Sequence, residues 1–185
     1  MAADFLMPLL TVEQCYPLIR TGESIDLWRD LRSHDLDLVI AETEPLDNAT
    51  CSLQSKLISR PKLVAVAGPD AQPSEHWENM SLLDYRTTSA YHFDVQNYLQ
   101  DNGLHPRSAG ETDDAFLMLE AAARGGFIAF VPQEVARKAI KEGHVTELAT
   151  IEISQTGIYA VYPASEMLDV AQQAVNNLIK NANQK

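Results

Sequence analysis

The sequence is poor in cysteine and has no long apolar run. Two cysteines, Cys15 and Cys51, occur among 185 residues, which is too few for a disulfide framework or a cysteine-based zinc site. A helix that crosses a bilayer needs about 20 consecutive apolar residues, and none of the apolar runs here approaches that length. The start, Met1-Ala2-Ala3-Asp4, has no basic segment followed by an apolar core, so no secretory signal is expected. We therefore expect a cytoplasmic protein with reduced thiols and no membrane contact.

Basic residues are also scarce. The chain has 14 Lys and Arg residues against 26 Asp and Glu residues, which gives a formal net charge of −12. An acidic surface repels the phosphate backbone of nucleic acids, and no basic stripe interrupts it. We expect that this chain alone does not bind duplex DNA.

Sequence motifs of enzymes are missing. The chain contains no Gly-x-Ser-x-Gly, no phosphate-binding glycine loop and no His-Glu-x-x-His, so we expect neither catalysis nor a cofactor. The histidines lack the spacing of metal ligands and favour polar surface roles, with pH sensing as the functional alternative. They are His34, His76, His92, His105 and His144.

One segment, Gly110–Pro132, contains a complete structural unit. Thr112 or Asp113 is a candidate N-cap for a helix, and Gly125-Gly126 supplies a residue type that readily takes the left-handed conformation at a helix end. The following run Phe127–Val131 is apolar throughout, which is typical of a strand buried on both faces. For Asp113 and Asp114 we expect helix capping, with an effector contact or a metal site as alternatives. Units of this α/β type bind small ligands at helix N-termini and strand carboxyl ends.

Strands and helices alternate along the rest of the chain, which predicts an α/β fold. Gly68–Pro73 breaks any regular structure, and we therefore predict two lobes, with residues 1–67 and 155–185 in lobe I and 68–154 in lobe II. Ser24 and Ser165 are the expected caps of two further helices. Helices are expected over about 24–34, 90–102, 133–142 and 165–179, strands over 36–41, 53–59, 63–67 and 157–162, a weak edge strand over 18–21, and short extended pieces over 145–148 and 151–153.

The order of these elements resembles the effector-binding domain of LysR-type transcriptional regulators. The matching phrases are LWRDLRSHDLDLVI (27–40), SRPKLVAVAGPDAQP (59–73), ETDDAFLMLEAAARGGFIAFVPQEVARKAIKEGHVTEL (111–148) and IYAVYPASEMLDVAQQAVNNL (158–178). Within that family, residues 109–132 look most like the regulator of sodium/proton antiporter expression. The resemblance implies a two-lobed, periplasmic-binding-protein-like (type II) domain in which lobe I lacks its first strand. It also implies that DNA is bound only through a winged helix-turn-helix that this chain does not contain.

The resemblance also implies an effector site in the cleft between the lobes. Thr87-Thr88-Ser89 places three hydroxyls before a helix, which suits either an N-cap or an anion or carboxylate site. In the family this loop faces the cleft. The loops with Asp4, Glu42, Thr43 and Thr112 face it as well, together with Phe130. Asp4 and Glu42 would make the cleft acidic, which fits a cation or an amine better than a carboxylate.

Taken together, these features predict a non-catalytic, ligand-sensing domain that controls transcription through effector-dependent rearrangement of its lobes and of the dimer. Its expected partners are a small-molecule or ion effector and a second copy of the chain, in a homodimer or higher oligomer. In the family, a helix of lobe I meets a helix of lobe II of the partner, which here indicates Ile25–His34 and Phe116–Arg124. A solute-binding receptor of a transport system and a small enzyme on the same scaffold are the alternatives.

Overall fold

The computed structural model places the chain in two compact units. It describes Leu10, Trp77 and residues 16–45, 53–72, 80–153, 156–164 and 169–182. Unit 1 consists of Met1–Arg60 and Gly157–Lys185, and unit 2 consists of Pro61–Thr156. Each unit has its own β-sheet with helices packed on it. Among the residues that the structure describes, no helix combines the length and the apolar character that a bilayer span requires.

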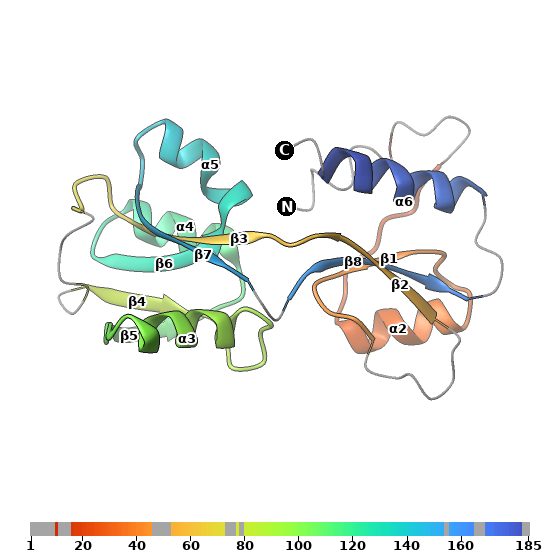
Figure 1. Cartoon of the computed structure of the whole chain (residues 1–185), viewed down its shortest axis with the longest axis horizontal. Helices are drawn as coiled ribbons and strands as arrows, with labels where there is room; N and C mark the ends of the chain where they lie inside the picture. The colour runs from red at the N-terminus through yellow and green to blue at the C-terminus, as the bar shows by residue number, and fades with distance from the viewer. Residues whose placement is uncertain are drawn as a thin grey trace. The chain divides into compact units, whose positions relative to one another are not determined.

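Unit 1 is built on an antiparallel sheet in the order β1-β8-β2. Successive side chains of a strand point to opposite faces, and β8 uses both. Ala160 packs in a cluster with Val175 and Leu178 of the C-terminal helix, whereas the next residue, Val161, packs with Leu31 of α2. The two helices therefore cover opposite faces (Figure 1). The elements are α2 (Ser24–Arg32), β1 (Val39–Ala41), β2 (Leu53–Ser59), β8 (Ile158–Pro163) and α6 (Asp169–Ala182).

Unit 2 is built on a mixed sheet in the order β5-β4-β6-β3-β7. Strands β4, β5 and β6 run parallel, and β3 runs antiparallel to both β6 and β7. The chain moves outward from β4 to β5 through α3 and returns past β4 to β6 through α4. Because such crossovers are right-handed, α3 and α4 lie on opposite faces of the sheet. The elements are β3 (Lys62–Ala67), β4 (Ser81–Asp84), α3 (His92–Asp101), β5 (Arg107–Glu111), α4 (Ala115–Ala123), β6 (Phe127–Pro132), α5 (Gln133–Lys141) and β7 (Thr146–Glu152).

The boundary between the units differs from the predicted one. Residues 63–67 were expected in lobe I, but β3 is hydrogen-bonded between β6 and β7 of unit 2. Its side chains from Leu63 to Ala67 are all buried, which only a position inside a sheet covered on both faces provides. The chain accordingly changes units at Arg60/Pro61 and not at Gly68. Strand β8, with Ala160, and strand β6, with Ile128, belong to different sheets.

Several local expectations can be compared with the structure. The double glycine ends α4 as predicted, since Gly125 and Gly126 have φ angles of 86° and 79°. Helix α2 starts at Ser24 itself after Glu23, with no side-chain cap, so the predicted cap at Ser24 is wrong. Residues 18–21 form no strand. The predicted cap at Ser165 lies outside the described residues, and so do residues 1–9, which bear on the predicted absence of a first strand in lobe I.

Candidate functional site

The parallel strands of unit 2 end side by side, and polar loops follow two of them. Asp84, the last residue of β4, is in register with Glu111, the last residue of β5. Residues 85–91 lead from β4 to α3, and residues 112–114 lead from β5 to α4. In open α/β sheets, ligands bind outside the carboxyl ends of the strands. We call these two loops, with Asp84, the candidate site.

Asp84 ties this edge of the sheet to α3. Its carboxylate Oδ1 accepts a hydrogen bond from the Tyr85 backbone N–H at 2.7 Å, and its Oδ2 accepts one from Gln96 Nε2 at 2.7 Å. His92 Nδ1 lies 4.0 Å from the same Oδ2 and 3.1 Å from the carbonyl oxygen of Tyr85. The side chains of His92 and Gln96 thus reach back from α3 to the end of β4.

The environment of Asp84 makes its negative charge costly. The residue is only 8 % exposed, and burial, which removes water from the carboxylate, raises the pKa of Asp84. The nearby charge of Glu111 acts in the same direction. The hydrogen bonds from Tyr85 and Gln96 and the proximity of His92 oppose the rise in this pKa without cancelling it.

The two loops of the candidate site are joined to each other. The backbone N–H of Thr112 donates to the carbonyl oxygen of Asp84 at 2.9 Å. Arg86 of the first loop forms an ion pair with Asp113 of the second. The structure therefore brings the predicted loops at 87–89 and 112 together within unit 2.

Helix α4 is capped by Asp114 rather than by Thr112 or Asp113. Its Oδ1 accepts the N–H groups of Phe116 and Leu117 at 3.0 and 3.2 Å. Thr112 Oγ1 accepts the N–H of Asp114 at 3.2 Å, and Asp113 turns to Arg86. The capping role expected for Asp113 and Asp114 therefore belongs to Asp114, whereas the N-cap predicted at Thr112 or Asp113 is wrong, because the edge strand β5 extends to Glu111.

The hydroxyl-rich segment Thr87-Thr88-Ser89 forms a turn and not a helix cap. Ser89 N–H donates to the carbonyl oxygen of Arg86 at 2.8 Å, and Ser89 Oγ accepts the N–H of Tyr91 at 3.4 Å. Helix α3 begins at His92 after Tyr91, without a side-chain cap. Thr87 and Thr88 are exposed, so their hydroxyls remain accessible to a ligand.

The remaining predicted site residues lie elsewhere. Phe130 is 1 % exposed, and its ring packs between Trp77 and Tyr98 with centroid distances of 5.9 and 5.8 Å. Its side chain points to the face of β6 that α3 covers, so we assign Phe130 to the core. Glu42 and Thr43 follow β1 in unit 1, where the carbonyl oxygen of Glu42 accepts the N–H of Gly157 at 3.3 Å. Asp4 lies outside the described residues.

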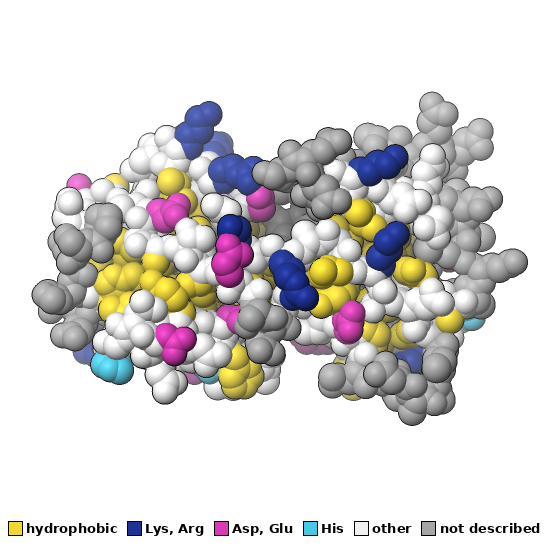
Figure 2. Space-filling model, in the orientation of Figure 1, with side chains coloured by type: hydrophobic (Ala, Val, Ile, Leu, Met, Phe, Trp, Pro, Cys, Tyr) yellow, Lys and Arg dark blue, Asp and Glu magenta, His cyan; other side chains and the backbone are white. Residues whose placement is uncertain are grey.

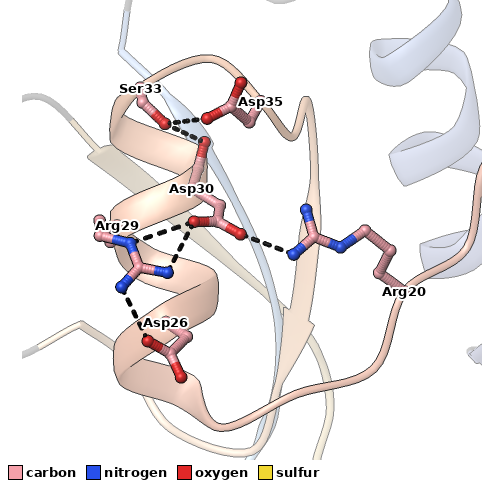
Figure 3. A network of polar contacts seen from close by, with 6 residues as sticks. All are labelled: Arg20, Asp26, Arg29, Asp30, Ser33 and Asp35. Carbon is pink, nitrogen blue, oxygen red and sulfur yellow. Dashed lines mark hydrogen bonds and ion pairs between the residues drawn. The ribbon is translucent and has the colours of Figure 1, made fainter.

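Unit 1 contains a second polar network, centred on Asp30 of α2 (Figure 3). Arg20 donates to Asp30 Oδ2 at 2.8 Å, and Arg29 donates to Oδ1 at 3.2 Å. Burial alone would raise the pKa of Asp30, but the hydrogen bonds and charges of the two arginines outweigh it and lower this pKa. The network links Arg20, in the segment before α2, to Asp30 of that helix, and we therefore assign it a structural role.

Reasoning from sequence missed Asp84, Arg86 and Gln96 as members of the site. One signal was available, because Asp84 follows the apolar pair Leu82-Leu83 at the expected carboxyl end of a buried strand. Metal binding has no support in the described part of the chain, where no three His, Cys, Asp or Glu side chains group together as ligands. The two loops of the candidate site instead present the hydroxyls of Thr87 and Thr88 and the Arg86–Asp113 ion pair as polar groups that a ligand can contact.

Comparison with known proteins identifies the family. The regulatory domain of HypT from Salmonella typhimurium in its apo form superimposes with a TM-score of 0.79 at 16% sequence identity, over 100% of this chain and 92% of that chain. The regulatory domain of NMB2055 (MetR) from N. meningitidis gives a TM-score of 0.67 at 16% identity, over 98% and 89%. Full-length HypT gives 0.74 at 16% identity, over 97% of this chain and 64% of that chain.

These similar structures are regulatory domains of transcriptional regulators, and together with the family match of this chain they do not favour a transport receptor. No curated protein sequence matches the chain. Residues 15–184 match the family described as the LysR substrate binding domain. The chain therefore belongs to the LysR substrate-binding domains, the regulatory, effector-binding domains of LysR-type transcriptional regulators.

Proposed function

We propose that the candidate site of unit 2 binds the effector of this regulatory domain. The observation that carries the proposal is the joining of its two loops, through the Thr112–Asp84 hydrogen bond and the Arg86–Asp113 ion pair. A ligand that contacts both loops meets the exposed hydroxyls of Thr87 and Thr88. The family resemblance adds Glu42 and Thr43 of unit 1 as predicted contacts, and it supports two lobes, with the chain changing units at Arg60/Pro61.

The effector is a small molecule or an ion, and its binding shifts the domain between conformations that already exist. Because this chain matches 64% of the length of full-length HypT, we propose that DNA is contacted by a winged helix-turn-helix in the complete regulator. Lys, Arg, Asp and Glu side chains are intermingled on the face shown in Figure 2, in keeping with a surface that does not bind nucleic acid. The proposed location is the cytoplasm.

We further propose that the domain acts as a homodimer in which α2 of one protomer packs on α4 of its partner. Exposed apolar side chains on both helices support this arrangement, namely Ile25 on α2 and Phe116 and Leu117 on α4. The narrower resemblance to the sodium/proton antiporter regulator rests on residues 109–132. These residues form the end of β5, α4, β6 and the turns between them, and control of antiporter genes stays a prediction.

A thermal-shift screen tests the effector site. The purified domain is melted with a panel of amino acids, amines, organic acids, sugars and inorganic salts. A compound present at 100 times its dissociation constant stabilises the folded domain by about 2.7 kcal/mol. We expect Thr88→Ala and Thr112→Ala to reduce that shift while changing the melting point of the free domain by the equivalent of at most about 1 kcal/mol.

The matched control is Thr150→Ala, which removes a hydroxyl that bonds Glu147 on β7. This variant should respond to the compound like the wild type. An unchanged shift in both Thr88→Ala and Thr112→Ala would remove the site from unit 2.

A further inference from the structure

A histidine and a buried aspartate meet below the turn at 87–89. His92 Nδ1 is 3.1 Å from the carbonyl oxygen of Tyr85 and 4.0 Å from Asp84 Oδ2. A carbonyl oxygen can only accept, so Nδ1 carries a hydrogen and donates it to Tyr85. The same nitrogen therefore faces two acceptors, one neutral and one charged.

Both side chains are shielded from water, with 16% of His92 and 11% of Asp84 exposed. The groups that act on Asp84 come from three neighbouring segments. The loop gives the Tyr85 N–H, α3 gives His92 and Gln96, and β5 gives the like charge of Glu111. Arg86 is paired with Asp113, so the aspartate faces His92 as its cationic partner when the imidazole takes up a proton.

We propose that Asp84 and His92 form a proton-sensitive switch that controls the conformation of residues 85–91. At neutral pH, Asp84 accepts the Tyr85 N–H, and His92 donates to the Tyr85 carbonyl, so both backbone polar groups of Tyr85 are hydrogen-bonded. When solvent delivers a proton to the pair, the imidazolium and the carboxylate attract each other. His92 then leaves the carbonyl of Tyr85 for Oδ2 of Asp84, and the start of the loop loses the hydrogen bond from His92.

Proton uptake belongs to the pair and not to one residue, because the two groups interact at short range. Burial makes the ionised carboxylate of Asp84 costly, and a positive charge on the neighbouring imidazole offsets that cost. The consequence for function rests on the proposed effector site, whose turn at 87–89 would bind its ligand with a pH-dependent affinity. The proton dependence of the turn itself does not require that a ligand binds there.

Amide hydrogen exchange followed by NMR tests the switch in the free domain. The reporter is the N–H of Ser89, which closes the turn on the carbonyl of Arg86 at 2.8 Å. Between about pH 8 and pH 5, the range in which histidine changes charge, its protection factor should fall about five-fold. That factor corresponds to the loss of one hydrogen bond, after correction for the intrinsic exchange rate.

Two variants and a control make the result specific. His92→Gln and Asp84→Asn should each remove the pH dependence of Ser89 exchange, whereas His144→Gln, at an exposed histidine beside Glu142, should leave it intact. A wild-type protection factor that stays constant over the range would overturn the switch even if both variants failed to fold. A dependence that persists in His92→Gln would do the same. A pH-dependent turn, together with an unchanged ligand-induced shift in Thr88→Ala and Thr112→Ala, would refute the effector site while upholding the switch.

Discussion

Two aspartates show how the immediate surroundings of a carboxyl group determine its pKa. Asp30 and Asp84 are both 8 % exposed. Asp30 is held by two arginines, and its pKa is lowered despite burial. Asp84 accepts hydrogen bonds from the Gln96 side chain and the Tyr85 N–H and lies near His92, and burial raises its pKa despite them. The folded state therefore favours the charged form of Asp30 and disfavours the charged form of Asp84.

The lowered pKa of Asp30 predicts a pH-dependent loss of stability in unit 1. Ionised Asp30 contributes stability above its ordinary value of 3.8, and this contribution is lost as the pH falls through the lower folded-state pKa. Asp30→Asn should therefore lower the melting temperature at neutral pH, and the difference from the wild type should shrink toward about pH 3. Circular dichroism melts at several pH values measure it, with exposed Asp37→Asn as the control. A difference that is the same at every pH would contradict the assignment.

The end of α2 carries a residue in an unfavourable backbone conformation. His34 has a φ of 63°, and the N–H groups of His34 and Asp35 bond the carbonyls of Leu31 and Asp30 at 3.3 and 2.9 Å. This is the Schellman pattern, in which glycine is preferred at the position of His34. His34→Gly should stabilise unit 1 by about 0.5–1 kcal/mol, because relief of left-handed strain exceeds the added chain entropy of glycine.

Urea unfolding followed by the fluorescence of Trp28, the tryptophan of unit 1, measures this gain. His34→Ala keeps the Cβ and should give no stabilisation. A stabilisation of equal size in the alanine variant would point away from the backbone explanation.

At the level of elements, the helix ends and strands that depend on a short stretch of sequence were predicted most accurately. Gly125-Gly126 and the apolar run after it gave the end of α4 and strand β6, because both depend on local preferences. Strand β5 escaped prediction. Its residues, Arg107–Glu111, are mostly exposed and have a single strand neighbour, β4. The pairing with β4 is a contact between distant segments, and a polar five-residue stretch carries no hydrophobic pattern that would predict a strand.

The candidate site was also predictable only in part, because some of its features depend on local sequence and others on contacts between distant segments. Hydroxyls in sequence marked the turn at 87–89, and the family resemblance added Thr112. The role of Asp84 depends on Gln96, which reaches it only after α3 folds back over the strand. The uniformly apolar run of β6 predicted that Phe130 is buried, but it has no alternation that shows which face of the sheet the side chain takes.

The cap of α4 is the element whose contribution is most directly testable. Asp114→Ala removes the acceptor for two backbone N–H groups and should destabilise unit 2 by about 1 kcal/mol. Asp114→Ser keeps a capping oxygen and should lose only a few tenths of a kcal/mol, by the ranking of cap residues. Urea unfolding followed by NMR, with the amide signals of unit 2 as the probe, measures the loss. Equal losses in the two variants would mean that charge or packing, and not capping, is what Asp114 provides.

At the scale of the whole molecule, the exposed apolar side chains of the two units call for a common explanation. Ile25 is 78% exposed on α2, and Phe116 and Leu117 are 68% and 54% exposed on α4. Trp28, by contrast, packs against a cluster with Leu31, Val39 and Val161. Changing Trp28 would therefore damage unit 1 itself, so it is no test of assembly. Exposed apolar side chains on two helices fit a self-complementary, two-fold interface between copies of the chain.

Light scattering on the purified domain tests this assembly. The wild type should be a dimer, and Ile25→Glu and Phe116→Glu should each give monomers, because a two-fold contact places every substitution in the interface twice. A buried, unpaired carboxylate costs several kcal/mol, which is enough to dissociate an interface of moderate affinity. Phe93→Glu is the matched control, since Phe93 is 61% exposed on α3, outside the proposed contact. A monomeric wild type, or dissociation by Phe93→Glu alone, would show that α2 and α4 do not form the interface.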